Sequence, residues 1–74
     1  MKLKSTDRAA MKDATMGCWW SNRAFPKEQP VWSGIANELY ALCIGSEYRD
    51  DMAEAREFSR LAHLADAMTI AQYA

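Results

Sequence analysis

The sequence contains few of the residues that build metal sites or phosphate-binding loops. Its 74 residues include two cysteines, one histidine, three glycines and two prolines. Cys18, Cys43 and His63 are the soft metal ligands, and none of them belongs to a close C-x-x-C or H-x-x-x-H pair, the arrangement that structural zinc sites normally use. The scattered glycines form no loop that cradles phosphate. We therefore expect neither a metal nor a cofactor.

Long apolar runs are also missing. No stretch approaches the roughly 20 apolar residues that a transmembrane helix needs. Lys2 and Lys4 resemble the start of a signal peptide, but Asp7 and Arg8 interrupt any apolar segment that would follow. We therefore expect a cytoplasmic protein with no membrane partner and with reduced cysteines. Half of the residues are hydrophobic, which favours one folded domain over a disordered chain.

An enzymatic centre is not apparent either. His63 stands three residues before Asp66, a spacing that brings an imidazole and a carboxylate to neighbouring positions on a helix. No nucleophile accompanies them in a recognisable motif. We assign no catalytic residue and expect a non-enzymatic protein.

Helix-favouring segments make up most of what remains. Pro26 and Pro30 bracket a polar loop, because proline disfavours helical geometry in the residue before it. Gly45 is predicted as a left-handed C-terminal cap, and Ser46 as the N-cap of the helix that follows. The predicted elements are a helix at about 5–22, a loop at 23–30, a helix at about 31–44 and a helix at about 47–72.

Helical spacing indicates how these elements pack. Apolar residues recur three and four positions apart, which predicts an all-α, compact three-helix bundle with a long C-terminal helix. The predicted core consists of Trp32, Leu39, Leu42, Phe58, Leu61, Ala65 and Met68, and Cys18 and Cys43 are also expected to be buried. Leu64 and Ile70 lie away from this stripe, so the helix is apolar nearly all round beyond Leu61. A homodimer through the C-terminal helix is one arrangement that covers those residues.

Two adjacent tryptophans are the main indication of function. Neighbouring residues on a helix are turned about 100° apart, so Trp19 and Trp20 cannot both enter one core from one face. One of them is expected to be exposed, and exposed tryptophan is typical of protein-binding surfaces. The nearby residues Arg23 and Phe25 are assigned to the same partner-binding surface. Trp32 belongs to the stripe of the second helix and is assigned to the core.

Charge is unevenly distributed along the chain. Residues 1–30 hold six Lys or Arg against three Asp or Glu, and residues 31–74 hold three against seven. The predicted third helix begins with an acidic patch that is interrupted by Arg49 and Arg56. The acidic residues that we assign to partner binding are Glu47, Asp50, Asp51 and Glu54, with Glu57 extending the patch. Such a patch can steer a basic partner toward the protein.

Nucleic-acid binding is a weaker hypothesis. Ala41 and Gly45 have the spacing of the small residue and turn glycine of a helix-turn-helix motif, and Ile44 is apolar as the motif requires. The helix that would read the DNA is acidic, and phosphates repel it. A possible contact to nucleic acid is the basic face of the first helix, formed by Lys4, Arg8 and Lys12.

These observations predict a small protein–protein interaction module. Its expected partner is a larger protein or protein complex that it inhibits or modulates. Short chains with few cysteines, no motif and many aromatic residues are common among bacteriophage and mobile-element accessory proteins, and in that style alone the chain is similar to them. The alternatives are a homo-oligomeric helical scaffold and, less favoured, a small nucleic-acid-binding protein.

Overall fold

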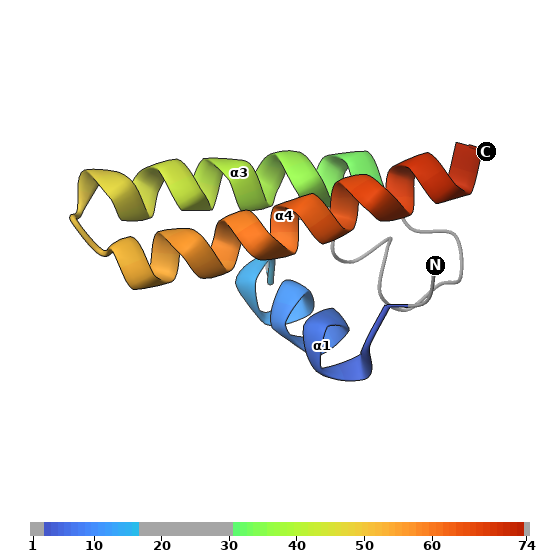
Figure 1. Ribbon diagram of the computed structural model, residues 1–74, viewed down its shortest axis with the longest axis horizontal. Helices are drawn as coiled ribbons and strands as arrows, with labels where there is room; N and C mark the ends of the chain where they lie inside the picture. Colours follow the sequence, from blue (N-terminus) through green and yellow to red (C-terminus); the bar gives the residue numbers. More distant parts are fainter. Residues whose placement is uncertain (1–2, 17–30, 74) are drawn as a thin grey trace.

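The computed structural model describes residues 3–16 and 31–73. Within them lie three helices, α1 (Ser5–Ala14), α3 (Trp32–Tyr48) and α4 (Met52–Tyr73). The helices α3 and α4 run antiparallel beside each other as a hairpin, and α1 lies against one side of it (Figure 1). The predicted all-α fold of three helices, with the C-terminal helix longest, is confirmed.

Helix α1 ends earlier than its predicted boundary at residue 22. The backbone N–H of Thr15 donates to the Met11 carbonyl at 3.0 Å, and the Thr15 hydroxyl donates to the same oxygen at 2.8 Å. Thr15 and Met16 form a turn after this last helical bond. The remaining part of the first predicted helix, residues 17–22, and the predicted loop at 23–30 lie outside the described residues.

Helix α3 continues past Gly45 to Tyr48, so the predicted C-terminal cap at Gly45 is wrong. Ser46 is not the N-cap of the next helix either, because it is fully buried inside α3 and its hydroxyl donates to the Leu42 carbonyl at 3.0 Å. A glycine within a helix costs only about 1 kcal/mol.

All three helices contribute to the core. Of the predicted core residues, Trp32, Leu39, Leu61 and Ala65 are buried, and Leu42, Phe58 and Met68 are half-buried against them. The buried cluster is completed by Met11, Ile35, Ala36 and Ala62. Three of its members are alanines, and small side chains allow helix axes to approach closely. The predicted burial of Cys43 is confirmed, and its thiol is free.

A small number of side chains hold α1 to the hairpin. Met11 of α1 is completely buried in the core. The Arg60 guanidinium on α4 contacts the Asp7 carboxylate at 2.9 Å. The Arg8 guanidinium lies 5.8 Å from the ring centroid of Trp32 on α3, a cation–π distance. The buried Met11 side chain, the ion pair of Arg60 and the cation–π contact of Arg8 therefore hold α1 against the hairpin.

The C-terminal part of α4 exposes less apolar surface than predicted. Leu64, which the helical spacing placed away from the core stripe, packs half-buried against the core. Ile70 is 71% exposed, in agreement with the prediction.

Among the helices that the structure describes, none combines the length and hydropathy required to cross a membrane.

Candidate docking surface at the tip of the hairpin

The turn between α3 and α4 has a fixed backbone geometry. Asp50 adopts a φ of 58°, in the left-handed region. Its N–H donates to the Glu47 carbonyl at 3.0 Å, and the N–H of Asp51 donates to the Ser46 carbonyl at 2.9 Å. These two bonds form a Schellman motif, which satisfies the last carbonyls of α3. Asp50 thus occupies the position that the sequence pattern assigned to a glycine.

Asp51 then starts α4. Its Oδ1 accepts a hydrogen bond from the Glu54 N–H at 3.1 Å, the geometry of an N-cap. Two of the acidic residues that were predicted to bind a partner therefore also shape the turn: Asp50 ends one helix and Asp51 begins the next.

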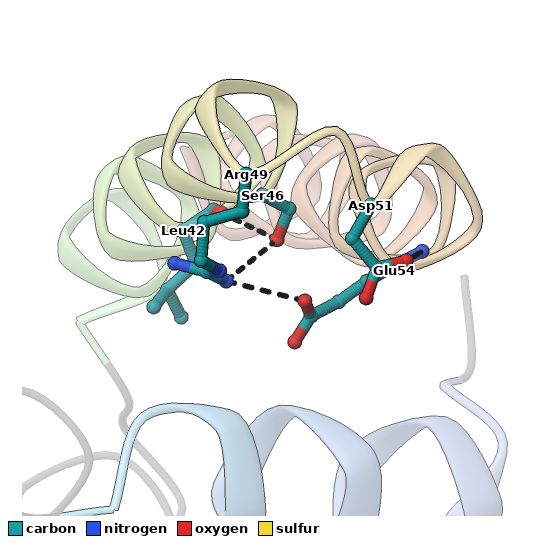
Figure 2. A network of polar contacts seen from close by, with 5 residues as sticks. All are labelled: Leu42, Ser46, Arg49, Asp51 and Glu54. Carbon is teal, nitrogen blue, oxygen red and sulfur yellow. Dashed lines mark hydrogen bonds and ion pairs between the residues drawn. The ribbon is translucent and has the colours of Figure 1, made fainter.

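The Arg49 side chain connects the end of α3 to the start of α4. Its Nη2 donates to the Ser46 hydroxyl at 3.3 Å and to the Glu54 carboxylate at 3.2 Å. Figure 2 shows this bridge on the side of the hairpin that faces α1. The Arg49 and Glu54 side chains are both substantially exposed, so the ion pair contributes little energy, but it joins the end of α3 to the start of α4.

The outer face of α3 is apolar near the turn. Projected at 100° per residue, Ala41, Ile44 and Tyr48 lie on the side of α3 opposite the buried Leu39. Ile44 is 54% exposed and Tyr48 is 87% exposed. With Glu47 they line a surface hollow of about 330 Å³. We name Ile44, Glu47 and Tyr48, together with the carboxylates of Asp50 and Asp51, the tip surface.

Acidic charge around the hollow is only partly neutralised. Arg49 pairs with Glu54, and Arg60 pairs with Glu57 and lowers the pKa of the Glu57 carboxyl by hydrogen bonding. Within the described part of the chain, no cation forms an ion pair with Glu47, Asp50 or Asp51. The acidic patch therefore divides into a neutralised part on α4 and an uncompensated part on the tip surface.

Cys43 lies one turn before Glu47, and its thiol donates to the Glu47 carboxylate at 3.5 Å. Burial raises the pKa of the Cys43 thiol most, and the hydrogen bond to Glu47 raises it further. Because the thiolate is the reactive form, the geometry favours a protonated, unreactive side chain.

A second polar cluster lies farther along the hairpin. The Tyr40 hydroxyl on α3 donates to the Asp66 carboxylate on α4 at 2.8 Å, and this hydrogen bond raises the pKa of the Tyr40 phenol. The Tyr40 and His63 rings meet edge to face at 5.7 Å. The Nδ1 of His63 lies 2.7 Å from the Ser59 carbonyl oxygen. Asp66 thus bonds to a tyrosine of the facing helix, and the cluster joins α3 to α4.

The other predicted site residues are distributed as follows. Lys4, at the N-cap of α1, and Lys12, within α1, are exposed, whereas Arg8 between them is half-buried and lies over Trp32. The basic face is therefore interrupted at its centre. The residues predicted to bind a partner near the first loop, Trp19, Trp20, Arg23 and Phe25, lie outside the described residues. No group of three or more possible metal ligands occurs in the segments that the structure describes.

The sequence reasoning missed Ile44 and Tyr48. Their signal is the spacing of three and then four residues from Ala41 to Ile44 and from Ile44 to Tyr48, which becomes visible only when one helix spans residues 41 to 48. Because the predicted helix ended at residue 44, Tyr48 was assigned to the next helix and this stripe was divided.

Comparison with known proteins gave no match: a scan against family models, a search of curated proteins and a search of solved structures each found none for this chain.

Proposed function

We propose that this protein is a small interaction module that docks on a larger protein or protein complex through the tip surface. The observation that carries the proposal is the exposure of Tyr48 and Ile44 beside a hollow. Tyrosine is among the residues that dominate binding energy at protein interfaces. Helix ends and a hydrogen-bonded turn hold these side chains, and rigid elements position a site more precisely than loops.

In this proposal the module acts in the cytoplasm and modulates or inhibits the complex that it binds, in the manner of phage and mobile-element accessory proteins. No catalytic group, metal or cofactor is required. The predicted surface with Trp19, Trp20, Arg23 and Phe25 remains a second candidate contact to the same partner.

The test is affinity capture from the native host with matched variants. Tyr48→Ser removes the exposed ring at the end of α3, and Ile70→Ser removes a comparably exposed apolar side chain near the C-terminal end of α4. We expect wild type and Ile70→Ser to retain the same partner and Tyr48→Ser to lose it. Thermal unfolding of all three proteins establishes that each is folded. Equal retention by the three would contradict the proposal.

The second candidate function is a homo-oligomeric scaffold that pairs through the C-terminal helix. The exposure of Ile70 favours it, but the half-buried position of Leu64 leaves little further apolar surface there. A monomer in sedimentation equilibrium at high protein concentration would exclude it. Nucleic-acid binding ranks below both, because only Lys4 and Lys12 of the predicted basic face are exposed and the tip surface is acidic.

A further inference from the structure

The tip surface combines an apolar hollow with carboxylates that form no ion pair with any cation of the described residues, and this combination restricts what can occupy it. Its volume of about 330 Å³ is at the lower end of the roughly 300–1,000 Å³ typical of pockets that bury a whole small molecule. Its described lining comes from one turn of one helix, Ile44 to Tyr48. The hollow therefore suits individual side chains of a larger partner.

Charge selects among such partners. The Glu47 carboxylate lines the hollow, and Asp50 and Asp51 follow within four residues. The nearest cation in sequence, Arg49, is already bonded to Ser46 and Glu54. The Tyr48 ring is 87% exposed, and its face is a further site of attraction for a cation. A partner group that enters beside Glu47 meets both a carboxylate and an aromatic ring.

We propose that the occupant of the tip surface is a basic amphipathic segment of the partner protein, with an apolar side chain in the hollow and an adjacent Lys or Arg paired with Glu47. This inference rests on the proposed function and specifies its partner. Amphipathic helices commonly bind apolar depressions in this way, and complementary charge sets their specificity. Nucleic acid and anionic lipid are disfavoured because both present phosphate to the same carboxylates.

Two synthetic helical peptides of equal length and equal leucine content test the charge requirement. One carries Lys and Arg at its polar positions, and the other carries Glu at the same positions. Fluorescence anisotropy measures the binding of each peptide to the full chain. We expect the basic peptide to bind, and the acidic peptide to bind at least about tenfold more weakly.

Matched variants then locate the binding. We expect Glu47→Gln and Tyr48→Ser each to weaken the basic peptide by about tenfold, because each removes a central contact. Asp13→Asn changes the net charge by the same amount at an exposed position of α1, and Ile70→Ser removes apolar surface elsewhere. We expect both controls to change the affinity by less than about twofold. Equal weakening by Glu47→Gln and Asp13→Asn would overturn the inference, because the attraction would then be general.

The outcomes separate this inference from the proposed function. If Tyr48→Ser loses the captured host partner while the two peptides bind alike, the inference fails and the proposed function stands. If Tyr48→Ser retains that partner, the proposed function fails whatever the peptides do. A wild-type dimer in sedimentation that Glu47→Gln converts to a monomer would identify a second copy as the occupant and overturn the inference.

Discussion

At the scale of single residues, Asp50 is the most unusual position. Its φ of 58° is a conformation that costs residues other than glycine about 1–2 kcal/mol, although Asp and Asn tolerate it better than most. We therefore expect Asp50→Gly to increase the free energy of unfolding by about 1 kcal/mol. Urea denaturation measures the change. Asp50→Asn removes the same charge but keeps a side chain, so it separates the backbone effect from the loss of charge.

The neighbouring aspartate should respond in the opposite direction. Asp51 accepts the N–H of Glu54 at the start of α4. Asp51→Ala leaves that N–H without its cap, and we expect a loss of about 1 kcal/mol in the free energy of unfolding. Asp51→Asn keeps an acceptor oxygen and should recover most of the loss. An Asp51→Ala protein as stable as wild type would mean that water replaces the cap at no cost.

At the scale of the helices, Gly45 is a weak position within α3. A Cβ added there meets the Arg49 Nη1 at 3.6 Å, which is ordinary van der Waals contact. We expect Gly45→Ala to stabilise the protein by about 0.5–1 kcal/mol, because alanine restricts the unfolded chain and favours helix. Thermal and urea unfolding check this. A destabilised Gly45→Ala protein would show that the new methyl group displaces the Arg49 bridge.

The same helix shows how far sequence reasoning extends. The core stripes were predictable because Leu39 and Leu61 follow the helical period, and period decides which face is buried. The end of α3 was not predictable, because the local sequence allows two C-terminal caps. One is a left-handed glycine at Gly45, and the other is a left-handed aspartate at Asp50. The structure has the second arrangement, with Asp50 in the left-handed conformation and Ser46 buried inside α3, and this burial depends on contacts between helices that the local sequence does not reveal.

The candidate docking surface was predictable in part. The acidic residues Asp50 and Asp51 were identified from their clustering in the sequence. The hollow could not be identified from the sequence, because it depends on Ile44 and Tyr48 belonging to one helix. The pairing of Glu54 with Arg49 was also hidden, because it joins two helices across the turn.

At the scale of the whole molecule, the attachment of α1 should depend on pH, because the ion pair between Asp7 and Arg60 joins α1 to α4. Hydrogen bonding to Arg60 lowers the pKa of Asp7 and of Glu57 below their ordinary values of 3.8 and 4.5. Both carboxyls therefore contribute stability that is fully present above about pH 5 and is lost as the pH falls through their lowered values. The association of α1 with the hairpin should weaken over the same acidic range.

The variant Arg60→Gln tests this linkage. We expect it to be less stable than wild type at about pH 7, and the difference to be smaller near pH 2, because the carboxyls lose their charge as the pH falls through their lowered pKa values. Urea denaturation at the two pH values measures the difference. A difference that does not change with pH would assign the role of Arg60 to the packing of its aliphatic stem.

The hydrogen-bonded turn has a thermodynamic consequence for recognition. Because the Schellman bonds at Asp50, the Asp51 cap and the Arg49 bridge already order this backbone, a partner that binds Tyr48 has little conformational entropy to remove. Its binding should therefore show a small negative heat capacity change that matches the apolar area buried, without the larger change that accompanies coupled folding. The free protein would already hold the shape that its partner meets.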